Sequence, residues 1–172
     1  MIATKLPKIF FENPTVEVAQ SLIGQGFHFH GINGVITETE AYVGQDDPAC
    51  HAAKGKTPRN AVMFDAAGKL YVYMIYGIHH CMNVVTESEG FPAAVLIRGL
   101  YLPEQKLHLD GPGKLCKFLK MDRSHNAIDV IESDACYFFK TKYKLNFTAT
   151  SRIGIKKGIE KPWRFVSEYL PN

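Results

Sequence analysis

The sequence predicts an α+β fold, a single domain with a mostly antiparallel β-sheet and flanking helices. Its 172 residues are the length of one domain rather than two. Short alternating or β-branched runs are separated by tight turns, a pattern typical of hairpins. Two further segments carry apolar residues at helical spacing. No repeat, heptad or linker interrupts the chain, so one domain spanning residues 1–172 is expected.

The first part of the chain predicts one helix followed by two strands. Asn13 and Pro14 form a capping and first-turn pair, and the apolar residues after them recur at helical spacing until Gly24 ends the run. Alternating and β-branched residues come next. Within them, Gly-Ile-Asn-Gly at 31–34 predicts a tight turn between two strands. The second strand is expected over residues 35–43.

The middle of the chain predicts a loop, a hairpin and a strand. Residues 44–59 are rich in Asp, Gly, Pro and Lys, and an ordered loop of this length is usually a binding loop. Residues 69–85 contain two apolar and aromatic runs around a single glycine, which predicts a β-hairpin that turns near Tyr76. Arg98 is embedded in an apolar strand expected over residues 93–100.

The last part of the chain predicts a helix and a closing set of strands. Gly-Pro-Gly at 111–113 leads into apolar residues at helical spacing, namely Leu115, Phe118 and Leu119. Residues 148–169 are typical of strands and turns that complete the same domain.

The charge is small on average but uneven. The formal net charge is +3, from 20 Lys and Arg against 17 Asp and Glu. Residues 1–110 hold 8 basic and 11 acidic residues, whereas residues 111–172 hold 12 and 6. The basic C-terminal third is compatible with a nucleic-acid partner, although composition alone does not require one.

Composition excludes several classes of protein. No stretch reaches the roughly 18 apolar residues of a membrane helix, and the N-terminus has no signal-peptide core. A cytoplasmic chain without membrane contact is therefore expected. The four cysteines form no CxxC pair, so neither a zinc knuckle nor a disulfide framework is indicated. We expect these thiols to be reduced and mostly buried.

The strand over residues 35–43 carries two carboxylates and a phenol on one face. Alternation places Ile36, Glu38, Glu40 and Tyr42 together. Paired carboxylates about 7 Å apart repel each other unless one is protonated, paired with a cation or used in chemistry. The face is either a solvated outer face or the site of a catalytic carboxylate, with glycoside-type hydrolysis the chemistry to consider. Spacing alone leaves both interpretations open.

Aromatic residues on the predicted hairpin suggest a flat ligand. Tyr71 and Tyr73 share one face of its first strand, and Tyr76 falls at its turn, where a large ring is hard to bury. Nucleobases stack on aromatic faces, and a wedge side chain in the minor groove unstacks the duplex. Tyr71 and Tyr73 are better explained as core residues, so Tyr76 is the stronger functional candidate.

Histidines and a helix start give weaker signals. The histidine pairs at 28 and 30 and at 79 and 80 suggest a metal site, but no HExxH motif or acidic ligand accompanies them. His51 follows the Glu40 strand and is positioned to return to the same pocket as a donor or stacking partner. Lys114, at the start of the helix after Gly-Pro-Gly, would grip a phosphate or simply mark a loop-to-helix junction.

Several ordered blocks together give a more specific signal than any of these motifs. They span most of the chain and read ETEAY at 38–42, TPRN at 57–60 with MF at 63–64, GKLYVYMIYG at 68–77, CMN at 81–83, LIR at 96–98 and GPGKL at 111–115. With these blocks and the closing KPWRF at 161–165, the sequence resembles the alkyladenine DNA glycosylase family, the 3-methyladenine DNA glycosylases of the AAG/MPG type.

The resemblance implies a fold and an activity. The fold is a single α+β domain with a curved antiparallel sheet and a protruding hairpin that inserts into the DNA minor groove. The activity is base excision repair. An alkylated or deaminated purine, such as 3-methyladenine, 7-methylguanine, hypoxanthine or ethenoadenine, is flipped out, and Glu40 activates the water that hydrolyses its N-glycosidic bond. An abasic site remains.

The resemblance also assigns residues to the DNA. Tyr42 matches the residue that stacks on one face of the flipped base, and His51 and Tyr73 match those on the other face. Tyr76 matches the intercalating residue. By the same resemblance, Asn83 disfavours the exocyclic amine of normal guanine, and Arg98 contacts the phosphate beside the flipped nucleotide. Lys114, from its place at the start of a helix, is a further candidate for phosphate binding.

The expected enzyme is a monofunctional glycosylase without lyase activity, because the matched motifs offer no nucleophilic lysine. It needs no metal or organic cofactor, and it acts as a monomer on double-stranded DNA in the bacterial cytoplasm, at the nucleoid. Two alternatives are a catalytically inactive lesion-binding module of the same fold and a metal-dependent hydrolase that uses the histidines.

Overall fold

The computed structural model of the chain describes residues 3–170. Its helices are α1 (Lys8–Phe11), α2 (Thr15–Leu22) and α3 (Pro112–Leu119), with short 3-10 turns η1 (Ala61–Phe64) and η2 (Arg123–His125). Its strands are β1 (Gly26–Phe29), β2 (Ile32–Val43), β3 (Leu70–Ile75), β4 (His79–Val85), β5 (Ala93–Leu102), β6 (Leu107–Asp110), β7 (Cys136–Phe139), β8 (Phe147–Thr150) and β9 (Arg164–Ser167).

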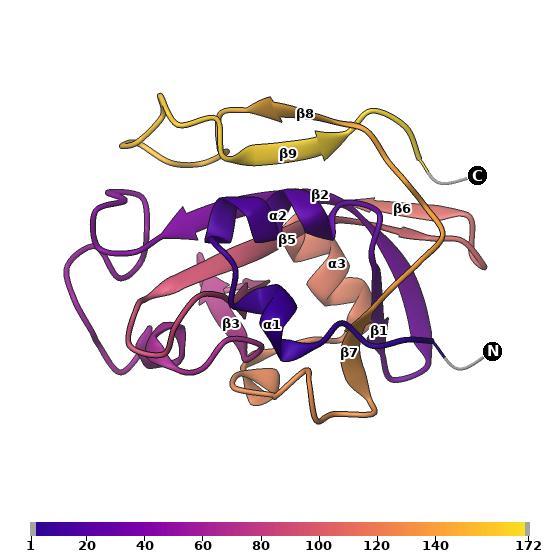
Figure 1. Cartoon of the computed structure of the whole chain (residues 1–172), viewed down its shortest axis with the longest axis horizontal. Helices are drawn as coiled ribbons and strands as arrows, with labels where there is room; N and C mark the ends of the chain where they lie inside the picture. The colour runs from indigo at the N-terminus through magenta and orange to yellow at the C-terminus, as the bar shows by residue number, and fades with distance from the viewer. Residues whose placement is uncertain (1–2, 171–172) are drawn as a thin grey trace.

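Within the described residues, all nine strands belong to one antiparallel sheet. The main path is β3-β4-β5-β2-β1-β7, while β6 pairs with β5, and β9 pairs with both β2 and β8. The long strand β2 pairs first with β1 and then with β9 along one edge, and with β5 along the other. Helices α2 and α3 lie over these central strands (Figure 1). The α+β architecture predicted from the sequence is confirmed.

Most of the core lies between the sheet and its helices. Leu22 of α2 and Leu115 of α3 are fully buried and belong to the same apolar cluster as Ile36, Ile97 and Leu100 of the central strands. The helix predicted after Gly-Pro-Gly is confirmed as α3, although Phe118, one of the residues at helical spacing, is 39% exposed. The helix instead buries Cys116 beside Leu115 and Leu119. All four cysteines are free and buried, as expected.

The turn between β1 and β2 lies earlier than predicted. Phe29 pairs with Ile32, so the turn consists of His30 and Gly31 rather than residues 31–34. Both have positive φ, +45° and +86°, which is the backbone signature of a type I′ hairpin turn. The sequence Gly-Ile-Asn-Gly therefore starts in the turn and continues into β2, which is three residues longer than expected.

A bulge in β2 changes which residues face the core. The register of β2 on β5 shifts between Ile36 and Glu38 and again between Glu38 and Thr39. The extra residue, Thr37, separates Ile36 from the carboxylates, so Ile36 packs in the core instead of sharing their face. Bulges of this kind re-aim side chains and are frequent beside functional sites. Glu38, Glu40 and Tyr42 keep the common face that alternation predicts.

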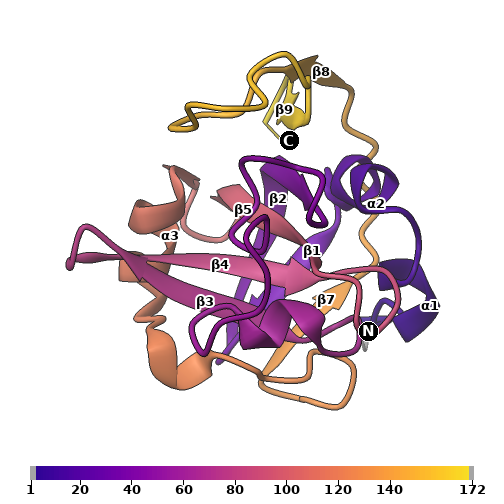
Figure 2. The ribbon, with the colours of Figure 1, turned by 90° about the vertical axis from the view of Figure 1, so that its left-hand side faces the viewer.

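The β3–β4 hairpin is confirmed and projects from the body of the molecule (Figure 2). Ile75 pairs with His79, which leaves Tyr76, Gly77 and Ile78 at the tip. Tyr76 has φ +51° and is 87% exposed. A left-handed backbone costs an aromatic residue about 1 kcal/mol or more, and such residues cluster at functional sites. The ring of Tyr76 is therefore presented to solvent at the tip of the hairpin.

Candidate active site

Glu40 is the only fully buried carboxylate on its strand face within the described chain. It lies in β2 between Leu96 of β5 and Arg164 of β9 and has no exposed surface. Its Oε1 accepts the backbone N–H of Ile153 at 2.7 Å, and its Oε2 accepts the hydroxyl of Tyr42 at 2.8 Å. Burial raises the pKa of Glu40 above its ordinary value, while Arg98 and both hydrogen bonds oppose the rise.

Glu38 lies beside Glu40 in a network with two arginines. Its Oε1 accepts Nε of Arg98 at 2.9 Å and Nε of Arg164 at 2.6 Å. Nε of Arg98 also lies 3.6 Å from Oε1 of Glu40. Two cations therefore neutralise the two carboxylates, and only 13% of the Glu38 side chain is exposed. The solvated-face interpretation of these carboxylates is wrong.

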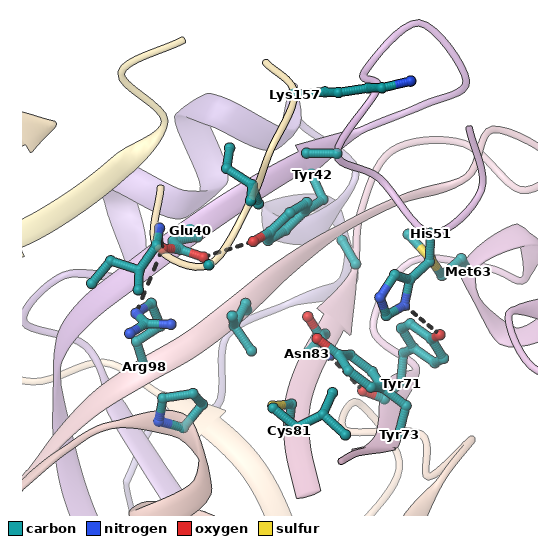
Figure 3. Close-up of a pocket in the computed structure, with 18 of the residues that line it drawn as sticks. Glu40, Tyr42, His51, Met63, Tyr71, Tyr73, Cys81, Asn83, Arg98 and Lys157 are labelled. Carbon is teal, nitrogen blue, oxygen red and sulfur yellow. Dashed lines mark hydrogen bonds and ion pairs between the residues drawn. The ribbon is translucent and has the colours of Figure 1, made fainter. Parts of the chain in front are cut away.

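A cavity of about 630 Å³ opens in front of Glu40. Figure 3 shows Glu40 and Tyr42 on one side and the rings of His51, Tyr71 and Tyr73 gathered on the other. The centroids of His51 and Tyr73 are 4.4 Å apart. A volume of this size, with aromatic walls and a few polar groups, is typical of a pocket for a small flat ligand.

The two hairpin tyrosines have different roles. Tyr71 is 1% exposed and belongs to a second apolar cluster, beneath the 44–64 segment, so its interpretation as a core residue is correct. Its hydroxyl nevertheless lies 3.0 Å from Nδ1 of His51, and burial raises the pKa of Tyr71 to about 12. Tyr73 is half-buried and packs against the same cluster while it lines the cavity.

His51 is held in place by its loop. The side-chain amide of Asn60 donates to the backbone oxygens of His51 and Gly55, each at 3.0 Å, and its Oδ1 accepts the Thr57 amide at 2.7 Å. His51 is an exposed residue, and partial desolvation of its ring together with the nearby Arg59 guanidinium lowers its pKa. The imidazole is therefore neutral at pH 7, which suits a stacking or hydrogen-bonding role better than an ionic one.

The remaining predicted residues fall into two groups. Asn83 is buried in β4, donates to the backbone oxygen of Tyr71 at 3.0 Å and lines the cavity. Seven of the eight predicted site residues line this one cavity: Glu40, Tyr42, His51, Tyr73, Tyr76, Asn83 and Arg98. Lys114 does not. It is exposed on the first turn of α3, where its Nζ is 2.7 Å from Asp110.

Sequence reasoning missed a segment that closes the site. Residues 151–158, named the strap here, bring Ile153, Lys156 and Lys157 to the cavity. Arg152 of the strap binds Asp47 in a fully buried ion pair. The only signal in the sequence was the basic character of the C-terminal third, which did not point to a particular arginine.

The histidine pairs do not form a metal site. Within residues 3–170, no three His, Cys, Asp or Glu side chains are placed to hold an ion. His28 is bonded to Asn33 at 2.8 Å and stacks on Tyr137, and His79 and His80 begin β4 next to the hairpin tip. The same described residues contain no helix long and apolar enough to cross a membrane.

The comparison with protein families decides which family this chain represents. The model of the family described as Methylpurine-DNA glycosylase (MPG) matches residues 9–170. The chain belongs to this family. Its members are DNA glycosylases, hydrolases of N-glycosyl bonds that act in DNA repair, which places this family member in that enzyme class and makes DNA its substrate.

Bacterial relatives of this family member are similar over nearly their whole length. A protein of Rickettsia felis is 51% identical over 162 residues, 94% of this chain and 92% of its own. Proteins of Sodalis glossinidius and of Wolbachia from Brugia malayi are each 54% identical, covering 95% and 93% of this chain and 97% and 95% of their own. All three carry the name "Putative 3-methyladenine DNA glycosylase".

Proposed function

We propose that this glycosylase removes alkylated or deaminated purines from double-stranded DNA and leaves an abasic site. The substrate class comprises 3-methyladenine, 7-methylguanine, hypoxanthine and ethenoadenine. The damaged nucleotide rotates out of the duplex into the cavity, where the bond between its base and its sugar is hydrolysed. The enzyme acts as a monomer in the bacterial cytoplasm, at the nucleoid, and needs no cofactor.

One observation carries the proposal. A fully buried carboxylate, Glu40, lies at the end of a cavity with aromatic side chains on two sides. A purine offers two flat faces and a glycosidic bond at one edge. Tyr42 stacks on one face and His51 and Tyr73 stack on the other, which brings the sugar to Glu40. The family membership and the names of the relatives agree with a methylated purine as the base that occupies the cavity.

Glu40 acts as the general base. Each of its oxygens accepts one hydrogen bond and has a further lone pair for water. The water gives a proton to the carboxylate as its oxygen bonds to C1′ of the sugar, and the C1′–N bond breaks with its electrons going to the base. Burial raises the pKa of Glu40, which makes it a stronger base than an exposed carboxylate.

The enzyme is monofunctional in this proposal. A lyase needs an amine that attacks C1′, and the nearest candidates are Lys54, Lys156 and Lys157 at the cavity. The ammonium of Lys157 points away from Glu40 (Figure 3). Water activated by Glu40 leaves no covalent intermediate. Borohydride should therefore trap no protein–DNA adduct.

Four other residues bind and select the DNA. Tyr76, exposed at the hairpin tip, enters the duplex and fills the space that the flipped base leaves. Asn83, on the side of the cavity opposite Tyr42, meets the exocyclic amine of an undamaged guanine and disfavours it. Arg98 contacts the phosphate beside the flipped nucleotide, and Lys114 contacts the backbone further along.

The test is base release from synthetic duplexes. Each duplex carries one hypoxanthine, one ethenoadenine or one alkylated purine, and strands are cleaved with alkali after incubation. Strand breaks that appear only after alkali, and disappear in Glu40→Gln, support the proposal and rank the lesions. Lesion binding without any breaks would instead identify an inactive binding module. Breaks without alkali, with an adduct trapped by borohydride, would contradict the monofunctional mechanism.

A further inference from the structure

Arg152 and Asp47 form an ion pair whose two side chains are completely buried. Nη1 of Arg152 lies 2.6 Å from Oδ2 of Asp47, and Nη2 lies 2.8 Å from Oδ1. Burial acts to raise the pKa of Asp47, but Arg152 and two backbone amides hold it below its ordinary value. A buried ion pair is expensive to desolvate, and replacing it with apolar residues often stabilises a fold. Stability alone therefore does not explain this pair.

The same guanidinium touches two parts of the active site, and the next residue of the strap touches a third. Nη1 donates to the backbone oxygen of Ala41, the residue between Glu40 and Tyr42, at 2.9 Å. The guanidinium carbon lies 4.8 Å from the ring centroid of Tyr42, a cation–π distance. The next residue along the strap, Ile153, donates its amide to Oε1 of Glu40 at 2.7 Å. Arg152 thus contacts strand β2 and the ring of Tyr42, and it directly precedes the residue whose amide binds Glu40.

Contacts from the other side hold Arg152 in this position. Its guanidinium carbon lies 5.2 Å from the ring of Trp163, and its Nη2 is 3.4 Å from the backbone oxygen of Gly158, at the far end of the strap. Gly158 has φ +69°, and a Cβ there would lie 3.0 Å from Nη2. Only a glycine lets the strap close over the ion pair without displacing it.

We propose that Arg152 is a positioning residue of this glycosylase: bound to Asp47, it seats the Ile153 amide on Glu40 and supports the ring of Tyr42. The inference rests on the proposed function, because it assumes that Glu40 is the general base. In this role, one guanidinium aligns the carboxylate of Glu40 with the ring of Tyr42. Arg152 itself touches neither the purine nor the sugar.

The pH dependence of excision reports this role. The groups that face Glu40 from β2, β4, β5 and the strap are Glu38, Tyr42, Cys81, Arg98, the Ile153 amide and Arg152. The amide stabilises the ionised carboxylate and so lowers the pKa of Glu40. Without Arg152 the strap moves, this amide is lost, and a larger fraction of Glu40 is protonated at a given pH. The acid limb, which is the pH range in which the excision rate falls as Glu40 becomes protonated, then moves to higher pH.

The experiment measures single-turnover excision from a hypoxanthine duplex against pH, with the full chain. Arg152→Lys keeps the positive charge but cannot bind Asp47 at two points. Gly158→Ala keeps both charges and pushes against the guanidinium. Gly31→Ala is the matched control, because Gly31 also has a positive φ but lies in open space at the β1–β2 turn. It strains the backbone without touching the ion pair.

We expect the rate of Arg152→Lys to fall by about tenfold at the acid end of the profile and by much less on its plateau, as for loss of a hydrogen bond to a charged group. Gly158→Ala should shift in the same direction by a smaller amount, and Gly31→Ala should keep the wild-type profile. Should Arg152→Lys fail to fold, Gly158→Ala decides the question alone. A folded variant with an unchanged acid limb overturns the inference.

Failure of the proposed function and failure of the role of Arg152 give different experimental results. If Glu40→Gln retains excision, or if the wild-type protein shows no acid limb, the proposed function fails and the role of Arg152 falls with it. If Glu40→Gln is inactive and the wild-type limb is present, but the limb does not move in either strap variant, only the role of Arg152 is rejected. A uniform loss of rate at every pH would assign Arg152 a purely structural role.

Discussion

The hydroxyl of Tyr42 donates to Oε2 of Glu40 over 2.8 Å. The two residues stand two positions apart on β2, so they share a face and a rigid backbone. Burial, followed by the charge of Glu40, raises the pKa of Tyr42, and the phenol remains a protonated donor throughout the working range of an enzyme. The bond couples a wall of the cavity to its carboxylate, so neither side chain can rotate without releasing the other.

Replacing Tyr42 with Phe tests this coupling. The ring that stacks on the base is kept, whereas one hydrogen bond to the Glu40 carboxylate is lost. That bond lowers the pKa of Glu40, so its removal raises the pKa further and shifts the acid limb of excision to higher pH. We expect the rate below the limb to fall by about tenfold. Tyr73→Phe, which loses a hydroxyl directed at Cys81, is the control, and an equal shift in both variants would contradict the prediction.

The buried carboxylate also makes the stability of the free protein depend on pH. The pKa of Glu40 in the fold lies above its unfolded value of 4.5. Its contribution to stability is therefore fully present below pH 4.5 and is lost as the pH rises through the folded pKa. Glu40→Gln removes this loss. Relative to wild type, we expect the unfolding free energy of this variant to rise between pH 4 and pH 8.

Urea denaturation at the two pH values measures the effect. Glu104→Gln serves as the control, because Glu104 is exposed, lies in the turn between β5 and β6 and does not line the cavity. A constant difference between Glu40→Gln and wild type across this range would show that the carboxylate is not destabilised by burial. Glu40→Gln should still bind lesion DNA, because a neutral amide of similar shape replaces the carboxylate.

Local rules predict much of the fold and the site. The helical spacing after Pro14, the turn at Tyr76 and Gly77 and the common face of Glu40 and Tyr42 depend on residues a few positions apart. Each of these features is present in the structure. The ordered blocks that resemble the glycosylase family supplied the residues from other elements, such as Asn83, that no local pattern connects to Glu40.

Features that depend on tertiary contacts were not predicted. The bulge at Thr37 arises from pairing with β5, and strict alternation cannot show it, so Ile36 was assigned to the wrong face. Asp47 and Arg152 lie 105 positions apart. An arginine in a basic C-terminal segment is normally a surface residue, and nothing in the sequence indicates that this one is buried against an aspartate of the 44–59 loop.

The exposed ring at the hairpin tip predicts a specific defect in lesion capture. Tyr76→Ala removes the wedge but leaves the cavity lining near Glu40 intact, so the flipped state loses stabilisation relative to the stacked duplex. We expect affinity for a lesion duplex to fall by about tenfold or more, with a corresponding loss of excision at limiting enzyme.

Fluorescence anisotropy with labelled duplexes measures this affinity. Tyr169→Ala, which removes another exposed tyrosine at 71% exposure, is the control and should bind as wild type does. A lesion in a single strand needs no wedge, so Tyr76→Ala should excise from single strands with little change. Equal defects on both substrates would assign Tyr76 to base binding rather than intercalation.

Lys114 is the predicted DNA contact that lies outside the cavity. Its role is tested by the salt dependence of DNA binding. Its ammonium is exposed and paired with the exposed Asp110, an interaction that a phosphate can replace at little cost. Removing one phosphate contact lowers the salt dependence of binding by about one counterion. We therefore expect Lys114→Ala to weaken binding to lesion and undamaged duplexes alike and to reduce the slope of log K against log salt by about one.

Lys144→Ala, which changes an exposed lysine that does not line the cavity, is the matched control. Equal slopes for Lys114→Ala and wild type would leave Lys114 as part of an ordinary loop-to-helix junction and remove it from the DNA interface.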